Sequence, residues 1–331
     1  MIERFIGASA AVLGMWAAAG AQAPAPTPTG VVVGVGNFSH IVESLDRSVQ
    51  FYRDVIGLEA PGAARLFSGD LPMKAGNTPG AESLFTALTV PGSPLGVEII
   101  EYRKIYRQPA RPRFQDPGAA NLILTVRDID AIAARVKKSG AQINSAGGVP
   151  ATIPGGSRVM FVQDPDGFFV ELFQPRTIPD SAAAVSSHVV NSGFEIMIAD
   201  TDRTLRLYRD VLGFDLQAGT TFDGSKLLMD TAGTPGAEFK RSAARIPGSP
   251  VTMAFLEFRN IDRRPLRTRF QDPGTPVLQL RVKDIQAVTQ AWKNAGGEVV
   301  TTGGEPVNLG NLTLVVLRDP NNVMLELIAT P

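Results

Sequence analysis

The sequence predicts an α+β protein in which one folding unit is written twice. Three observations lead to this prediction. Four motifs recur at one constant spacing, strand-like and helix-like patterns of apolar residues follow one another within each copy, and the chain of 331 residues can form two domains of about 150 residues. Hydrophobic residues make up 44% of the chain and charged residues 19%, which is typical of a globular protein.

The duplication is visible in four pairs of motifs, and the members of every pair are 156 residues apart. In the order of the first copy they are FYRDVIGLE at 51–59 and LYRDVLGFD at 207–215, TPGAE at 78–82 and 234–238, PGSP at 91–94 and 247–250, and RPRFQDPG at 111–118 and RTRFQDPG at 267–274. Because chance does not hold one offset across four motifs, the sequence indicates an internal duplication.

A weaker repeat divides each copy again. The segment NFSHIVESLDRSVQFYRDVIG, from Asn37, parallels NLILTVRDIDAIAARVKKSG, from Asn121. Each pattern predicts a strand, a polar turn and an amphipathic helix, which ends at Gly57 or Gly140. Strand-like runs follow each helix, and the DPDG sequence at 164–167 marks a turn between two of them. Each quarter of the chain is therefore predicted to form a strand, a helix and two or three further strands.

Residues 1–21 are predicted to form a secretory signal peptide. A charged start is followed by the uncharged run 5–19 and by a small-residue exit, which favours cleavage after Ala21. Cleavage two residues later is disfavoured by Pro24. The alternatives are an uncleaved anchor or a buried helix. Residues 22–30 then form an extended linker, and we expect an exported protein, periplasmic or secreted, that has no contact with the membrane after cleavage.

Composition excludes several function classes. Lysine plus arginine and aspartate plus glutamate each number 32, so the chain lacks the basic excess of a nucleic-acid-binding protein. It has no cysteine, which excludes disulfides, thiol catalysis and thiolate metal sites. The two histidines, His40 and His188, cannot supply several imidazole ligands from one half of the chain. The oligomeric state is not indicated.

The chain resembles the vicinal oxygen chelate superfamily of glyoxalases, bleomycin-resistance proteins and extradiol dioxygenases. The resemblance lies in the strand and SLDRSVQFYRDVIGLE opening, the V-x-D-I turn in TVRDID and RVKDIQ, and the QDPDGFFVELFQP ending. It implies four βαβββ modules paired into two tandem glyoxalase-like domains, 31–175 and 188–330, each with a curved-sheet cavity. Residues 176–187 would form the linker.

The resemblance also implies a divalent metal held by residues of the first and last strands of each module. Those positions hold Asn37, Glu98, Asn121 and Glu171 in the first half, and Gly193, Ala254, Val277 and Glu326 in the second. Neither set contains an imidazole, which disfavours iron dioxygenase chemistry and a zinc or nickel glyoxalase site. We expect no cofactor. A hard ion such as Mg²⁺, Mn²⁺ or Ca²⁺, bound by the first set, stays open.

Two functions follow for the first-half cavity and its small-molecule ligand. In one, Glu98 or Glu171 is the general base of a lyase, isomerase or hydrolase, because partial burial raises the pKa of a carboxyl group. In the other, the protein only binds and sequesters the ligand. Asn37 and Asn121 are expected to line the cavity in both cases.

Two further features are candidate parts of a site. Arg111 and Arg113 could bind an anionic ligand, but the favoured interpretation is that Arg113 pairs with Asp116 to fix the connecting loop. Side chains alternate along a strand, so His40 should face away from Asn37 and the cavity unless a bulge reverses it.

Overall fold

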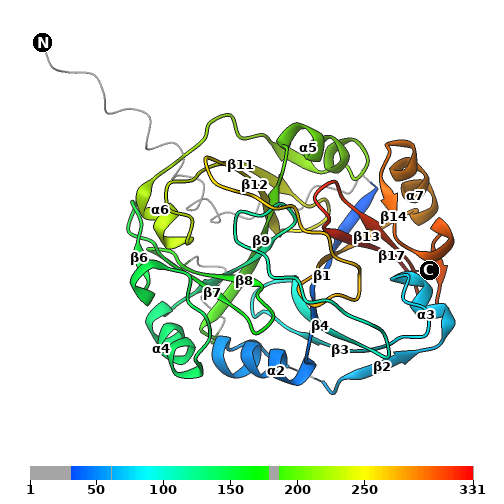
Figure 1. The fold of residues 1–331 in the computed structure, drawn as a ribbon, viewed down its shortest axis with the longest axis horizontal. Helices are drawn as coiled ribbons and strands as arrows, with labels where there is room; N and C mark the ends of the chain where they lie inside the picture. Colours follow the sequence, from blue (N-terminus) through cyan, green and yellow to red (C-terminus); the bar gives the residue numbers. More distant parts are fainter. Residues whose placement is uncertain (1–30, 61, 179–185, 331) are drawn as a thin grey trace, which may run out of the picture.

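The computed structural model describes residues 31–60, 62–178 and 186–330. The predicted signal peptide, the linker 22–30 and most of the linker between the halves lie outside the described residues. Two mixed sheets form the centre, and the helices lie at the rim (Figure 1). None of the helices in the described ranges is long and apolar enough to cross a membrane. The predicted α+β class is confirmed.

The larger sheet has nine strands and is built from the first and last quarters of the chain. Its spatial order is β14 (Glu298–Val299), β16 (Thr313–Arg318), β17 (Met324–Ala329), β13 (Pro276–Val282), β1 (Val32–Val42), β4 (Gly96–Arg103), β3 (Glu82–Leu88) and β2 (Arg65–Ser68), with β15 (Val307–Asn308) paired to β16. The two quarters meet where β1 runs antiparallel to β13.

The smaller sheet has eight strands from the second and third quarters. Its order is β10 (Asp215–Gln217), β11 (Glu238–Arg245), β12 (Thr252–Arg259), β9 (Val189–Ile198), β5 (Ala120–Val126), β8 (Phe169–Gln174), β7 (Arg158–Gln163) and β6 (Ala151–Thr152). Its quarters meet where β5 runs antiparallel to β9. Equivalent strands occupy equivalent places in both sheets, as the duplication predicts, but each sheet takes one module from each half.

The helices begin and end where local sequence signals place them. The main ones are α2 (Leu45–Gln50), which continues as a π-helical segment (Phe51–Ile56), α4 (Ile129–Ser139), α5 (Thr201–Asp210) and α7 (Ile285–Asn294); shorter ones are α3 (Asp70–Ala75), α6 (Lys226–Thr231) and the 3₁₀ turns Ala146–Gly148 and Thr302–Gly304. The side chains of Ser44, Asp128, Asp200 and Asp284 cap the four main helices. The first and second of these helical segments end at Gly57 and Gly140, as predicted, in left-handed conformation.

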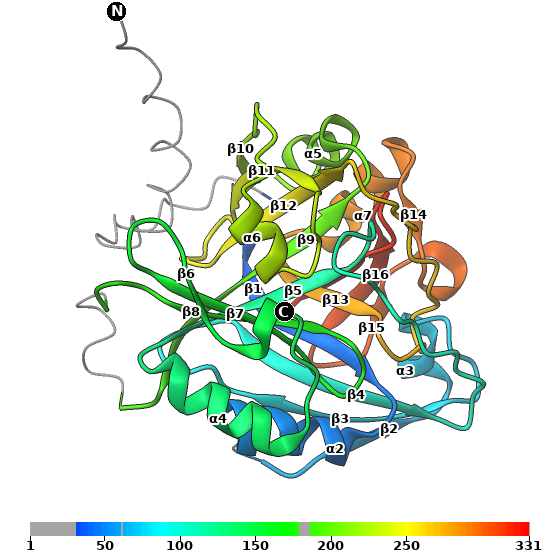
Figure 2. The ribbon, with the colours of Figure 1, turned by 60° about the vertical axis from the view of Figure 1, so that its left-hand side comes forward.

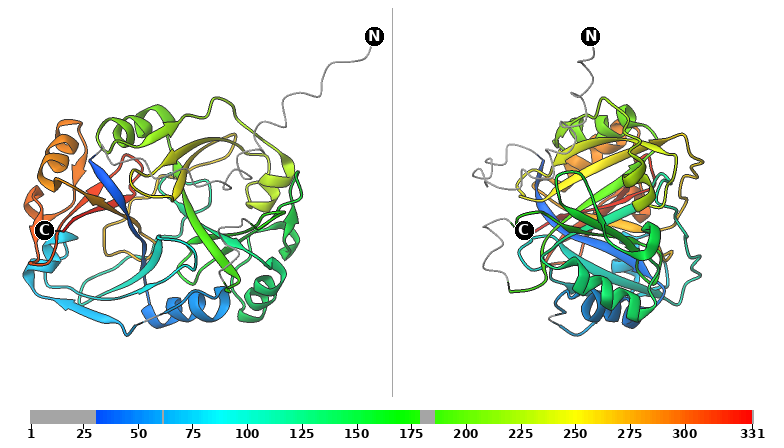
Figure 3. Two further views of the ribbon diagram at one scale, coloured as in Figure 1. Left: turned by 180° about the vertical axis from the view of Figure 1, so that it is seen from behind. Right: turned by 90° about the vertical axis from the view of Figure 1, so that its left-hand side faces the viewer.

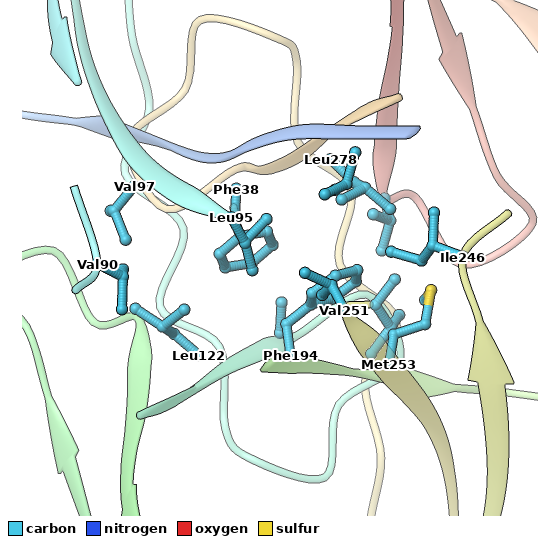
Figure 4. Close-up of a cluster of buried hydrophobic side chains, with 14 of the residues drawn as sticks. Phe38, Val90, Leu95, Val97, Leu122, Phe194, Ile246, Val251, Met253 and Leu278 are labelled. Carbon is cyan, nitrogen blue, oxygen red and sulfur yellow. The ribbon is translucent and has the colours of Figure 1, made fainter. Parts of the chain in front are cut away.

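One apolar core joins the two sheets. The side chains labelled in Figure 4 form pairs whose members are 156 residues apart: Phe38 and Phe194, Val90 and Ile246, Leu95 and Val251, Val97 and Met253, and Leu122 and Leu278. The rings of Phe38 and Phe194 stack with centroids 5.4 Å apart. Burial of each such side chain stabilises the fold by about 1.5–3 kcal/mol, so the inter-sheet contact is a major part of the core.

The central strands β1, β5, β9 and β13 run through the middle of the molecule, as Figures 2 and 3 show from the side and from behind. Because side chains alternate along a strand, the residues next to the core residues face outward from each sheet. Those two outer faces carry buried polar side chains, among them several carboxyl groups.

Candidate active site

Each outer sheet face combines a small apolar cluster with buried carboxylates. The cluster on the nine-stranded sheet consists of Ile41, Met73, Ala81, Ile100, Tyr102, Phe270, Val277, Val300, Val316 and Met324. The cluster on the eight-stranded sheet consists of Phe114, Ala119, Ile153, Val159, Phe161, Phe169, Phe173, Met197, Met229, Ala232, Ala237, Leu256 and Phe258. A carboxyl group beside such a cluster loses much of its hydration, which raises its pKa.

On the nine-stranded sheet, one side-chain amide lies between two glutamates. Gln279 Nε2 on β13 donates to Glu98 Oε2 on β4 at 2.7 Å and to Glu326 Oε2 on β17 at 3.1 Å. Ser39 on β1, paired with Glu98 across the ladder, donates its hydroxyl to the same Glu98 oxygen at 2.8 Å. We call Ser39, Glu98, Gln279 and Glu326 the glutamine site.

The backbone of β1 fixes the orientation of Gln279. The ladder between β1 and β13 is irregular between Val35 and Phe38, and there the Asn37 N–H donates to Gln279 Oε1 at 3.0 Å. With its oxygen held in this way, the amide must turn Nε2 toward the carboxylates. Gly36 is needed for the close approach, because a Cβ at this position would lie 2.8 Å from Gln279 Cβ.

The glutamine site favours protonated carboxyl groups. Burial and the neighbouring charge of Glu326 raise the pKa of Glu98 from 4.5 to about 7, although the hydrogen bonds from Ser39 and Gln279 oppose the shift. Burial also raises the pKa of Glu326. Within the described ranges, the structure gives neither carboxylate an arginine or lysine partner. The site can therefore take up and release a proton near neutral pH.

The eight-stranded sheet carries a second amide between two glutamates. Asn121 Nδ2 on β5 donates to Glu171 Oε2 on β8 at 3.0 Å and to Glu195 Oε2 on β9 at 3.3 Å. Arg241 Nε on β11 donates to the other Glu195 oxygen at 3.3 Å. We call Asn121, Glu171, Glu195 and Arg241 the asparagine site.

The asparagine site differs in charge from the glutamine site. Burial and the charge of Glu195 raise the pKa of Glu171 well above its usual range, whereas Arg241 and the hydrogen bond from Asn121 lower it. Asn121 Oδ1 is buried and has no hydrogen-bond partner in the described chain. Arg241 compensates part of the negative charge, but the pKa of Glu171 remains raised well above its usual range, so this carboxyl group is less suited to accept a proton from a ligand than Glu98.

The structure separates the residues expected to form one cavity. Glu98 lies in the glutamine site, while Asn121 and Glu171 lie in the asparagine site on the other sheet. The expected convergence of Asn37, Glu98, Asn121 and Glu171 in one cavity is wrong. The strand pairing joins the first module to the fourth rather than to the second. Asn37 contributes its backbone N–H only; its side-chain oxygen lies against Gly96, where a Cβ would be 2.5 Å away.

Residue counting missed Ser39, Gln279, Glu195 and Arg241. It did name Glu326, but placed it in a second-half set with Gly193, Ala254 and Val277. The alternation of side chains along a strand could have identified Ser39 and Gln279 as site residues. Each lies two residues after an expected ligand position, Asn37 or Val277, and therefore on the same face of its strand.

His40 lies on the face opposite Ser39, as the parity argument predicts. Its Nδ1 is 2.8 Å from the Tyr52 hydroxyl and 3.6 Å from Asp164 Oδ2, and its ring stacks on Phe168 with centroids 3.8 Å apart. His40 is fully buried and joins the first module to the second. It is therefore not part of either carboxylate site.

The RFQDPG segments close the two outer faces. Arg113 pairs with Asp116 and Arg269 with Asp272, each at 2.7 Å, which confirms the loop-fixing interpretation. Phe270 packs edge-on against Tyr102 in the cluster beside the glutamine site. The repeat places Phe114 in the same way against the cluster of the asparagine site. Arg111 lines a separate cleft and contacts neither carboxylate pair in the described structure.

The donor groups do not fit the divalent metal that the fold family implies. In both sites the position between the carboxylates is taken by an amide N–H₂ group, a hydrogen-bond donor, whereas hard cations require oxygen ligands. Within the residues that the structure describes, no group of three or more histidine, aspartate or glutamate side chains could hold a metal ion.

Comparisons with known proteins agree with this fold. The model of the Glyoxalase/Bleomycin resistance protein/Dioxygenase superfamily matches residues 34–172 and 187–327. Lactoylglutathione lyase GLX1 of Arabidopsis thaliana is 24% identical over 183 residues, which are 54% of this chain and 55% of that protein. The match thus spans about half the length of this curated relative.

Two solved structures have a similar fold over most of the chain. Glyoxalase I from Zea mays matches with a TM-score of 0.55 and 17% identity, covering 91% of this chain and 92% of that one. A putative dioxygenase from Bacillus subtilis matches with a TM-score of 0.53 and 13% identity, covering 92% and 87%. At these identities the likeness shows the fold alone.

Proposed function

The chain belongs to the Glyoxalase/Bleomycin resistance protein/Dioxygenase superfamily, and on this premise we propose that it is a metal-independent lyase or isomerase that moves a proton on a small organic molecule. Glu98 is the base. The observation that carries the proposal is a buried carboxyl group with a pKa of about 7 and, in the described chain, no cation beside it. A general base is most effective when its pKa lies near the working pH.

The hydrogen bonds assign a role to each oxygen of Glu98. Ser39 and Gln279 both donate to Oε2 and hold the carboxylate in place. The described residues provide no donor to Oε1, which is the oxygen that takes the proton from a carbon next to a carbonyl group. The same proton then returns to the neighbouring atom in an isomerisation, or to the leaving group in an elimination. Ser39 and Gln279 are positioning residues.

Deuterium exchange tests this proposal on any compound that carries an acidic C–H bond. The purified protein is incubated in D₂O with lactoylglutathione, hydroxyketones and 2-oxo acids, and loss of the C–H signal is followed by NMR. Glu98→Gln should lower exchange at least about a hundredfold, the usual contribution of a general base. Glu171→Gln makes the same change in the asparagine site and should retain most of the rate.

Equal exchange by the wild type and Glu98→Gln would contradict the proposal. A compound that binds in calorimetry, but exchanges no proton, would favour the alternative of a binding protein. That alternative rests on the aromatic side chains of Tyr102 and Phe270 beside the carboxylates, which suit an apolar ligand. Exchange should survive dialysis against a chelator, and loss of activity that Mg²⁺, Mn²⁺ or Ca²⁺ restores would show that a hard ion takes part.

We also propose that the protein acts outside the cytoplasm, because residues 1–21 have the pattern of a secretory signal. Protein recovered from the periplasm should have an intact mass that begins at Gln22. A soluble form that retains residues 1–21 would contradict this.

A further inference from the structure

A cleft lies between the two segments that connect the modules, 104–119 and 260–275. These segments are held together symmetrically: the Gln108 N–H donates to Asp272 Oδ1 and the Arg264 N–H donates to Asp116 Oδ1, both at 2.8 Å. The two bonds are related by the 156-residue repeat. The cleft therefore lies on the axis that relates the two halves, with a wall from each half.

The cleft has a volume of about 290 Å³ and a positive wall. Its charged lining residues are Arg111, Arg113, Arg264, Arg267, Asp116 and Asp272, four cations against two anions. The lining thus has a net charge of +2. This charge is concentrated in one concave site, although the chain as a whole has a formal charge of zero.

Two of the arginines are not used by the fold. Arg113 pairs with Asp116 and with Asp262, and Arg264 lies 3.3 Å from Asp262. Within the described ranges the structure gives Arg111 and Arg267 no hydrogen bond or ion pair, and both are exposed. They occupy the same place in the two copies, so they form a symmetric pair of guanidinium groups at the cleft.

A buried hydroxyl in the cleft wall also has no partner. Thr268 is 6% exposed and lines the cleft, but Oγ1 makes no hydrogen bond within the described chain. A buried polar group left unpaired costs about 1–3 kcal/mol. The equivalent position in the other copy is Pro112, which has no hydroxyl. Thr268 thus distinguishes one wall of an otherwise symmetric cleft.

We propose that this cleft binds a small dianion, a phosphate or a dicarboxylate, between Arg111 and Arg267. Guanidinium groups donate paired hydrogen bonds to carboxylate and phosphate oxygens, and a net charge of +2 matches a dianion. Thr268 supplies one further hydrogen bond if its side chain turns the buried hydroxyl toward the cleft. The cleft shares no side chain with the glutamine site or the asparagine site, so this binding is distinct from the proposed proton transfer.

Calorimetric titration of the purified protein with inorganic phosphate and with succinate tests the proposal, with acetate as a monovalent control. Arg111→Gln/Arg267→Gln should weaken dianion binding at least tenfold. Arg203→Gln/Arg206→Gln is the matched control, because it removes two exposed arginines from a different cleft, between α5 and the segment 295–298 that follows α7. It should bind as the wild type does. Binding of phosphate alone, or of succinate alone, would identify which source of the dianion the cleft accepts.

Thr268→Val gives an independent measurement. Without ligand the variant should be as stable as the wild type or more stable, because the hydroxyl has no partner to lose. Its dianion binding should be weaker at least threefold. The proposal would be overturned if the wild type showed no saturable binding of phosphate or succinate. It would also be overturned if the two arginine double variants bound these dianions equally well. A Thr268→Val protein that is less stable, but binds as the wild type, would remove Thr268 from the site.

Discussion

The glutamine site and the asparagine site hold the same group, an amide N–H₂ between two glutamates, on equivalent faces of two related sheets. They build it from different positions. Glu326 and Glu171 correspond in the repeat, but the second carboxylate is Glu98 on β4 in one site and Glu195 on β9 in the other. The bridging amides, Gln279 and Asn121, are also not equivalent. The same arrangement, an amide between two glutamates, is thus formed in the two copies by residues that mostly do not correspond in the repeat.

The main difference between the sites is a single cation. Arg241 on β11 reaches Glu195 in the asparagine site, and the repeat places Phe85 on β3 at the corresponding position beside the glutamine site. Arg241 opposes the rise in the pKa of Glu171, which burial and the charge of Glu195 still raise well above its usual range. No cation of the described chain opposes the rise in the pKa of Glu98, which is about 7. This comparison teaches that burial is the larger cause of protonation in both sites, and that a single cation only opposes it.

Removal of the Glu98 charge should give the largest effect. A carboxyl group with a higher pKa in the folded state than in the unfolded state binds its proton more tightly when folded. Its contribution is fully present below pH 4.5 and is lost as the pH rises through about 7. Glu98→Gln should therefore flatten the pH dependence of the free energy of unfolding by roughly 3 kcal/mol between pH 4.5 and 8.

Urea unfolding at several pH values measures this slope. Glu59→Gln, an exposed carboxylate outside both sites, is the control and should retain the wild-type slope. A Glu98→Gln protein with the wild-type slope would show that Glu98 is ionised throughout and that the glutamine site does not differ from an exposed carboxylate.

Arg241→Met should convert the asparagine site into a pair without this cation. We expect a loss of about 2 kcal/mol at pH 8, below the value for a fully buried ion pair because the Arg241 side chain is 26% exposed. The loss should vanish at low pH, where the carboxyl groups are protonated. Chemical unfolding checks this, with Arg245→Met, exposed on the same strand, as the control. A loss independent of pH would indicate packing rather than charge.

The two amides should differ in what their removal costs. Gln279→Leu leaves the Asn37 N–H without its acceptor and Glu326 without its donor, while Glu98 keeps only the hydrogen bond from Ser39. Asn121→Leu, in contrast, also removes the unpaired Oδ1. We expect Gln279→Leu to be more destabilising by about 1 kcal/mol. Thermal unfolding of both variants at pH 8 measures the difference in stability. Equal losses of stability would show that the unpaired Asn121 oxygen does not destabilise the folded protein.

Much of the fold could be predicted from the sequence because its signals are local or periodic. The repeat, the caps at Ser44 and Asp128 and the helix ends at Gly57 and Gly140 follow from nearest neighbours along the chain. The pairing of modules could not be predicted. It depends on which apolar faces meet, and the two copies carry nearly the same apolar pattern, so pairing within a half and pairing between halves have the same sequence signature.

The candidate site was predictable only in part for the same reason. Glu98 and Glu171 were identified by strand parity and family position, and both are buried in carboxylate pairs. Their partners Gln279 and Glu195 come from the other half of the chain, so they follow only from the tertiary pairing. The β1 irregularity that turns the Asn37 N–H toward Gln279 has no sequence pattern of its own.

Phe85→Arg tests whether the single cation explains the difference between the two sites. Phe85 is partly buried and packs against the cluster beside Glu98, so an arginine there can lay its stem on the apolar face while its guanidinium stays near water. A nearby positive charge favours the ionised carboxylate, so the pKa of Glu98 should fall from about 7 by about one unit. NMR titration of the glutamate carboxyl carbons measures this shift. Any deuterium exchange catalysed by Glu98 should then extend to lower pH.

Phe85→Leu removes the ring without adding charge and should leave the pKa of Glu98 near 7. If both variants shift it equally, the ring rather than the missing cation sets the protonation of the glutamine site, and the sites differ by packing instead of charge.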